Sequence, residues 1–172
     1  MKTRRILATA FVLAAAFAVR SAAAIATPPR AEIIFDHPDK FSDVRDYYIP
    51  TDKGTESILG RIREHMVNEA KYYVPAGCKL TVTFTDIHLA GDFEPWRGPQ
   101  FDEIRIVKDI YPPSFKFTYT LADASGKVLK QGSENIRDIN FQIRIAIDTS
   151  DPLRYEKDIL DEWMRSTLPR KG

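Results

Sequence analysis

The densest group of side chains that could do chemistry lies between Thr85 and Pro99. This segment reads TDIHLAGDFEPWRGP, and it holds three carboxylates and one imidazole, namely Asp86, His88, Asp92 and Glu94. Carboxylate oxygens are the ligands that a hard cation such as calcium prefers. Carboxylates could equally supply the acid and the base of a hydrolase. Because Gly, Pro and acidic residues also make up ordinary surface loops, a purely structural role is a third interpretation.

An aromatic and a cationic side chain follow this acidic group. Trp96 and Arg97 are residue types that dominate the binding energy of protein interfaces, so they favour contact with a ligand or partner. A structural role would instead have Trp96 and Phe93 anchor the loop to the core. Further polar and aromatic candidates lie in the run that ends at Pro113. The candidate binding residues are Asp86, Asp92, Glu94, Trp96, Arg97, Arg105 and Tyr111.

No recognised catalytic signature accompanies these residues. The chain has no G-x-S-x-G motif, no P-loop, no dinucleotide fingerprint and no H-E-x-x-H motif. His65 and Glu69 stand four residues apart on a predicted helix and could share a metal ion, but two ligands do not make a zinc site. We therefore expect no metal site and no cofactor.

Hydrophobic patterning predicts the elements that must position the candidate residues. Short apolar or alternating runs at Ala31–Phe35 and Lys79–Leu89 predict strands. Apolar residues recur every three or four positions over Lys53–Tyr73, which predicts an amphipathic helix with Asp52 as its N-cap. In the second strand the apolar set shifts by one residue near Thr85-Asp86, and this shift indicates a β-bulge.

The second half of the chain predicts a hairpin, one more strand and a helix. Ser114–Leu121 alternates strictly and returns through a turn into Val128–Ser133. Apolar residues alternate again over Ile139–Ile147, which predicts another strand. Ser150 or Asp151 then caps a final helix, with Pro152 at its first position. These elements predict a single α+β domain, an antiparallel sheet with two main helices packed on one face.

The first 26 residues have the layout of a secretory signal peptide. Lys2, Arg4 and Arg5 precede an apolar run, Ile6–Val19, and small residues that offer A-x-A cleavage sites follow. Because an anchor that spans a bilayer needs about 20 apolar residues, this run is too short to be one. We expect residues 1–26 to be removed and residues 27–172 to work in the periplasm or outside the cell, with no membrane span.

The net charge and the cysteine content limit the classes of partner that the protein could bind. Removal of residues 1–26 changes the net charge from +1 to −3, with 21 basic and 24 acidic residues left. We expect no nucleic-acid partner, because such a domain lacks the required basic surface. The single cysteine, Cys78, cannot pair within the chain, so we expect it to be buried and reduced. An intermolecular disulfide or a reactive thiol is the alternative.

Several motifs of the predicted mature chain resemble one family. They are DIHLAG before the acidic Trp segment, then IRIVKDIYPP, DASGKVL, IRDINF and a closing LRYEKDILDEW. Together they resemble a family of exported bacterial proteins called domain of unknown function 3016, over about Glu32–Trp163. The resemblance implies an envelope or secreted location in Gram-negative bacteria, and it implies no reaction.

The sequence thus favours an exported envelope protein that is a non-enzymatic binding module and contacts a partner or ligand through residues 86–112. The first alternative is a small periplasmic hydrolase or metal-dependent enzyme that uses Asp86, Asp92 and Glu94. The second is a structural envelope protein without a discrete pocket. Carboxylates that converge in a cleft would favour the enzyme. An exposed Trp96 beside Arg97 would favour a binding surface.

Export predicts a processed N-terminus. Mass spectrometry of the mature protein should find a new N-terminus between Ile25 and Thr27, because the A-x-A sites lie there. Protein recovered outside the inner membrane with Met1 intact would contradict this prediction.

Overall fold

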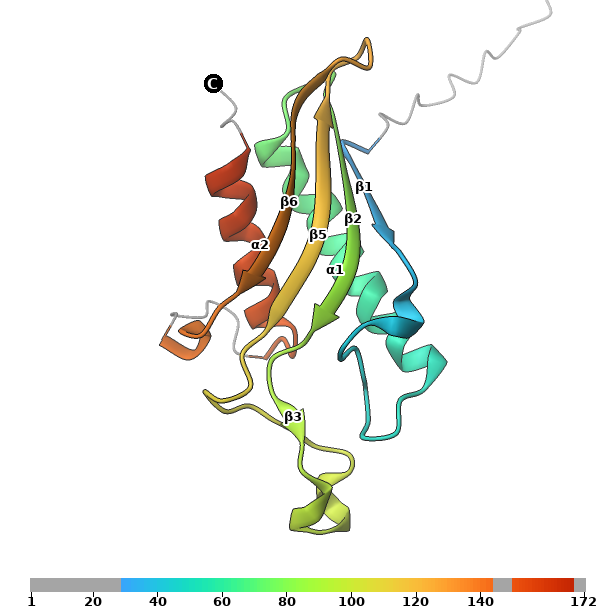
Figure 1. Ribbon diagram of the computed structural model, residues 1–172, viewed down its shortest axis with the longest axis vertical. Helices are drawn as coiled ribbons and strands as arrows, with labels where there is room; N and C mark the ends of the chain where they lie inside the picture. Colours follow the sequence, from blue (N-terminus) through green and yellow to red (C-terminus); the bar gives the residue numbers. More distant parts are fainter. Residues whose placement is uncertain (1–28, 144–149, 169–172) are drawn as a thin grey trace, which may run out of the picture.

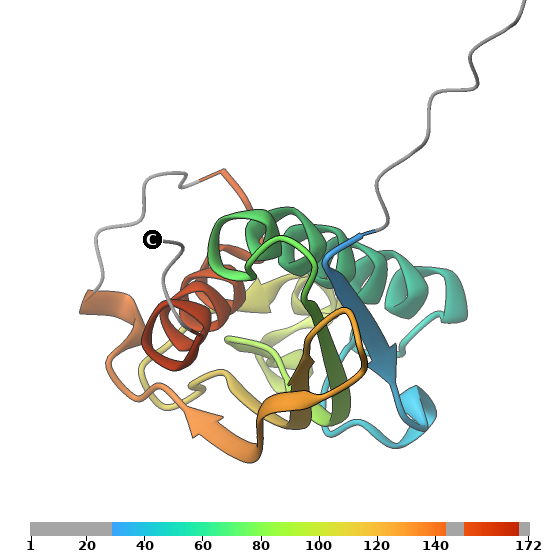
Figure 2. The same ribbon diagram turned by 90° about the horizontal axis from the view of Figure 1, so that it is seen from above.

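Two helices pack on one face of a four-stranded sheet, and a long loop projects from one end of it. The computed structural model describes residues 29–143 and 150–168. Figure 1 shows the sheet with the projecting loop at its lower end, and Figure 2 shows both helices on the same side of the sheet. The predicted α+β class is confirmed. The predicted signal peptide lies outside the described residues.

The sheet contains four strands in the order β1-β2-β5-β6. They are β1 (Ala31–Phe35), β2 (Lys79–His88), β5 (Ser114–Ala122) and β6 (Val128–Arg137). The pairs β2–β5 and β5–β6 are antiparallel, as predicted, but β1 runs parallel to β2. The sheet is therefore mixed, because the chain between β1 and β2 crosses over through a helix and returns to the same end of the sheet.

The two helices begin slightly away from the predicted positions. Helix α1 spans Asp52–Tyr73, and its N-cap is Thr51, whose Oγ1 accepts a hydrogen bond of 3.0 Å from the Gly54 backbone N–H. Helix α2 spans Arg154–Thr167. The Asp151 carboxylate accepts from the Leu153 backbone N–H in a turn that precedes α2, so neither Ser150 nor Asp151 is its N-cap.

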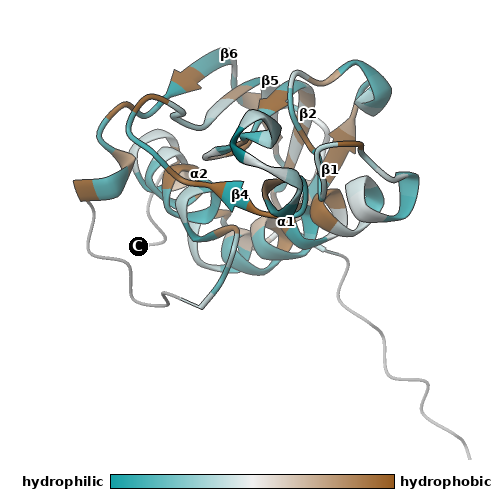
Figure 3. Cartoon of the chain, turned by 90° about the horizontal axis from the view of Figure 1, so that it is seen from below, coloured by the Kyte–Doolittle hydropathy of each residue, from teal (hydrophilic) through white to brown (hydrophobic). Residues whose placement is uncertain are grey.

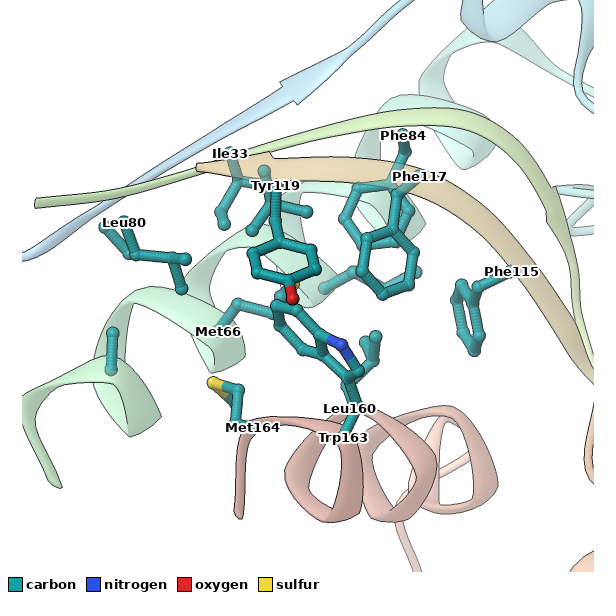
Figure 4. Packing of buried hydrophobic residues seen from close by; sticks show 14 of the residues in the cluster. Ile33, Met66, Leu80, Phe84, Phe115, Phe117, Tyr119, Leu160, Trp163 and Met164 are labelled. Atoms are coloured by element: carbon teal, nitrogen blue, oxygen red, sulfur yellow. The ribbon is translucent and has the colours of Figure 1, made fainter. Parts of the chain in front are cut away.

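The core fills the space between the helices and the sheet. The eight residues that the sequence patterns predict to be buried together lie in one buried cluster, namely Ile62, Met66, Leu80, Val82, Phe115, Phe117, Tyr119 and Trp163. Trp163 of α2 points at the sheet, and its ring centroid lies 4.8 Å from that of Phe117 and 5.2 Å from that of Tyr119 (Figure 4). Edge-to-face contacts of this kind fix how α2 sits on β5.

The predicted β-bulge is present in β2. The pairing with β5 shifts between Phe84 and Asp86, so Thr85 has no opposite residue. Because of this extra residue, Phe84 and Ile87 both face the core, although they stand three positions apart. The bulge thus keeps the apolar face continuous up to the loop that leaves β2.

The predicted strand over Ile139–Ile147 is wrong in its described part. Strand β6 ends at Arg137, and the Asp138 carboxylate accepts from the Asn140 backbone N–H. This side-chain turn leads into a short 3-10 helix, Phe141–Ile143, because it offers the backbone an alternative to a strand ladder. Only Phe141 of the alternating set is buried there, whereas Ile143 is 80% exposed. Residues 144–149 lie outside the described residues.

Cys78 is only half-buried, at the end of the turn between α1 and β2. Cys78 is therefore less enclosed than predicted, and the reduced state of its thiol stays a prediction. The Cys78 backbone N–H donates to the Pro75 carbonyl, so this residue closes the turn and does not enter the core.

Phe117 is the best probe of the core. Its side chain is buried and contacts Phe84 as well as Trp163. Replacement of Phe117 by Ala should lower the free energy of unfolding by about 3–5 kcal/mol, because it leaves a cavity that the surrounding layers cannot close. Urea denaturation measures the loss. A loss below about 1 kcal/mol would mean that this strand face does not form the core.

Candidate binding tip

The candidate residues gather in the projecting loop, residues 90–112, which we call the tip. It contains a small two-stranded sheet, β3 (Asp92–Phe93) and β4 (Arg105–Ile106). Two short 3-10 helices, Pro95–Arg97 and Pro99–Phe101, form its far end. A proline opens each 3-10 helix, so the backbone there is stiff.

The base of the tip is fixed by three successive backbone N–H groups. Leu89 donates to the Asp43 carbonyl, Ala90 to the Glu156 carboxylate and Gly91 to the Tyr111 carbonyl. These acceptors belong to the segment after β1, to α2 and to the returning limb of the tip. Three consecutive residues therefore bind three separate parts of the fold.

Gly91 is required at this base. Its φ is +80°, and a Cβ atom there would lie 2.8 Å from the Ile106 carbonyl oxygen. Any other residue would be strained in this backbone region and would push β3 away from β4.

A buried ion-pair network braces the tip from inside. The Asp43 side chain is only 1% exposed, and its two oxygens accept hydrogen bonds of 2.9 and 3.0 Å from Arg105. Arg45 donates from Nε to the same carboxylate at 2.8 Å, and its terminal Nη2 donates to Asp92, also at 2.8 Å. Both guanidinium groups lie against the ring of buried Phe93. The network thus joins both limbs of the tip to the segment after β1.

The Asp43 carboxylate is stabilised in its ionised form. Burial alone would raise its pKa, but the hydrogen bonds from Arg105 and Arg45 outweigh burial and hold the pKa below the ordinary value of 3.8. The same hydrogen bond raises the pKa of the Arg45 guanidinium, so both partners are held in their charged forms.

A second charged cluster closes the far half of the tip around Glu94. The Glu94 carboxylate accepts from the Lys108 ammonium and from the Tyr111 hydroxyl, the latter at 3.1 Å. Arg97 lies 3.2 Å from its other oxygen. The hydrogen bond from Lys108 lowers the pKa of Glu94, and burial together with Glu94 raises that of Tyr111. Glu94 is therefore an anchor for three side chains.

Trp96 projects from this braced frame into solvent. It is 72% exposed, and Arg97 beside it is also exposed.

The Tyr48 backbone N–H donates to the Asp102 carbonyl, which ties a second exposed segment to the tip. Further exposed apolar side chains lie on these segments, namely Tyr47, Tyr48, Ile49, Ile104, Val107 and Ile110. Figure 3 views this end of the molecule, where brown stretches lie among hydrophilic ones.

The predicted carboxylates do not form one site. Asp86 lies in β2 and accepts from Ser42 and Lys116, so it shares no hydrogen-bond partner with the carboxylates of the tip. Burial opposes ionisation of Asp86, but hydrogen bonds from Ser42 and Lys116 lower its pKa. Asp92 pairs with Arg45 and Glu94 with Lys108. Each carboxylate therefore has its own cationic partner.

Arg105 and Tyr111 are in the tip, as predicted, but they face inward and support it. Of the seven candidates, Trp96 and Arg97 present the most side chain to solvent. The predicted anchor Phe93 is buried, whereas Trp96 is not, so the structural interpretation holds for one aromatic residue and not for the other.

Sequence reasoning missed Asp43, Arg45, Lys108 and Glu156. Glu156 is only 1% exposed, yet it holds α2 to the base of the tip through Ala90, at 2.6 Å. Burial raises its pKa. In the sequence Glu156 is an ordinary acidic residue in the first turn of a helix, and Asp43 lies in a polar connection, so no signal in the sequence marks either as buried.

The metal hypothesis gains no support from the described residues. His65 bonds to Asp161 of α2 at 2.7 Å and does not form a pair with Glu69. Within residues 29–143 and 150–168, no group of three potential ligands lies close enough to hold a metal ion. No helix in the same ranges has the length and hydropathy needed to cross a bilayer.

The comparison with known families agrees with the motifs. A family profile described as "Protein of unknown function (DUF3016)" matches residues 29–166. The chain belongs to the DUF3016 family. The DUF3016 match includes every candidate residue of the tip and the buried network beneath it. Searches of curated proteins and of solved structures found no match.

Asp43, beneath the tip, should be the position whose replacement destabilises the tip most. At pH 7, Asp43→Asn should lower the free energy of unfolding by about 3 kcal/mol, because two guanidinium groups lose a buried partner. The pKa of Asp43 is lower in the folded state, so its stabilisation is present above pH 3.8 and is lost as the pH falls through the folded value. The difference between wild type and Asp43→Asn should therefore shrink below pH 3.8.

Urea denaturation over this pH range measures both effects. Asp36→Asn is the control, because the Asp36 side chain is exposed and lies beside another exposed side chain, that of His37. That control should change stability by less than about 0.5 kcal/mol. A constant difference between wild type and Asp43→Asn across the pH range would contradict the assignment.

Proposed function

We propose that this DUF3016 protein is an exported envelope protein that works as a non-enzymatic binding module, with the tip as its contact surface. The observation that carries the proposal is the exposure of Trp96 on a loop that buried ion pairs hold in place. The basic start and short apolar run of the sequence support export.

Covering the exposed Trp96 ring would remove its apolar surface from water, which favours association. Trp96 and Arg97 are the residue types that most often dominate interface energies, and Arg97 also lies over the Phe101 ring. Because the tip is already ordered by its own contacts, a partner would not have to immobilise a long loop on binding. Large apolar side chains beside a polar frame are typical of a protein-protein contact.

The chemistry of the carboxylates supports binding over hydrolysis. A general acid needs a carboxyl whose pKa is raised toward neutrality, but the pKa values of Asp86 and Glu94 are lowered by their partners. Each carboxylate of the predicted site is also occupied by a cation of the chain itself. Asp92 and Glu94 therefore support the geometry of the tip, whereas Asp86 joins β2 to Ser42 and to Lys116 of β5.

The test is a photo-crosslinking pull-down of the mature protein in periplasmic extract of its own host. The double variant Trp96→Ala/Arg97→Ala should reduce recovery of crosslinked partner at least about tenfold, the effect of losing two interface hot spots. Tyr72→Ala is the matched control, because Tyr72 is an equally exposed aromatic residue, 69%, on α1. This control should leave recovery unchanged.

Thermal melts of the same variants separate binding from stability. Trp96→Ala should leave the melting temperature within about 1 °C of wild type, because an exposed side chain contributes little to folding. A drop of several degrees with recovery retained would mean that Trp96 supports the fold, and the binding surface would then lie elsewhere.

A further inference from the structure

Strand β6 is one of the two edge strands of the sheet, and its outer side is long. β6 is ten residues long, twice the length of β1 at the opposite edge. Within residues 29–143 and 150–168, no strand pairs with the outer side of β6. Figures 1 and 2 show it at the rim of the sheet. An edge of this length is a template for pairing with another chain.

The register shows which backbone groups of β6 are available. Arg137 lies opposite Ser114, and the next residue, Asp138, donates its backbone N–H to the Pro113 carbonyl. In an antiparallel ladder, alternate residues direct their backbone groups to the same side. Even-numbered residues therefore bond to β5, whereas the N–H and C=O groups of Gln131, Ser133 and Asn135 point outward.

Two opposite charges flank the middle of this strand. Lys130 and Glu134 stand two residues on either side of Gly132, on the same face of the strand. Lys130 reaches the Thr167 carbonyl at the end of α2. The Glu134 side chain makes no hydrogen bond or ion pair with the described part of the chain, although its charge raises the pKa of Tyr119. On this face β6 thus carries one cation and one anion, at equal distances from a glycine.

We propose that β6 pairs antiparallel with β6 of a second copy of this chain, about a two-fold axis at Gly132. In this register Lys130 of each copy lies opposite Glu134 of the other, so the interface contains the same ion pair twice. Gln131 and Ser133 face each other with their outward backbone groups, which completes the ladder. The two sheets then form one continuous eight-stranded sheet, and the tip takes no part in the contact.

The neighbouring registers are less favourable. An axis at Ser133 would place Lys130 opposite Ile136, and an axis at Gln131 would place Glu134 opposite Val128. Either arrangement sets a charge against an apolar side chain and leaves both ion pairs unmade. A lone charged side chain on an edge strand normally discourages pairing. Here a second copy would give both Lys130 and Glu134 an oppositely charged partner.

The test is sedimentation of the mature protein with charge reversals. Lys130→Glu and Glu134→Lys each put like charges opposite one another twice, so each should raise the dimer dissociation constant at least about tenfold. The double variant Lys130→Glu/Glu134→Lys restores opposite charges and should return the constant to within about threefold of wild type. Glu32→Lys, on the opposite edge strand β1, is the matched control and should leave dimerisation unchanged.

Hydrogen exchange of the wild type gives an independent readout that needs no variant. Raising the protein concentration should slow exchange of the backbone N–H groups of Gln131, Ser133 and Asn135, and leave those of the residues between them unaffected. A wild type that stays monomeric up to about 1 mM, the weak limit of specific association, overturns the proposal. A dimer that tolerates both single reversals also overturns it.

Discussion

The tip depends on the carboxylate of Asp43, a charge that is taken almost entirely out of water. Such a charge is tolerated only when cations and hydrogen bonds surround it. Arg105 and Arg45 meet this need, and in doing so they connect the limbs of the tip to the segment after β1. The backbone of Leu89, Ala90 and Gly91 adds bonds to three different elements at the same place. The exposed Trp96 is presented by this frame.

Much of the fold could be predicted because its helices and strands arise from local, periodic patterns of apolar residues. The alternation of β5 and the stripe of α1 are repeated patterns, and the one-residue shift in β2 located the bulge. The parallel pairing of β1 could not be read in this way, because it depends on where the chain returns after α1. Over Ile139–Ile143 the pattern misled, since the Asp138 side chain turns the backbone before a strand can continue.

The long loop could be located from the sequence, but its construction could not. Residues 90–99 of the acidic Trp segment lie in the tip, yet their carboxylates bind cations that lie close only after folding. Arg105 meets Asp43 across 62 residues of sequence, and Glu156 meets Ala90 across 66. The sequence around a polar loop residue looks the same whether the folded protein buries its side chain or leaves it in water. The residue types alone therefore could not distinguish a hydrolase from an interaction surface.

The ion pairs of the tip also bear on how easily a protease could cleave this loop. The loop offers three basic positions at which a trypsin-like protease would cleave, Arg97, Arg105 and Lys108, and each is engaged with Glu94 or Asp43. A protease needs a segment that can open locally, and these contacts hold the backbone beside every one of its preferred bonds. The basic side chains that a trypsin-like protease would recognise are the same ones whose ion pairs hold the loop in place. The contacts that present Trp96 should therefore also protect the loop from proteolysis.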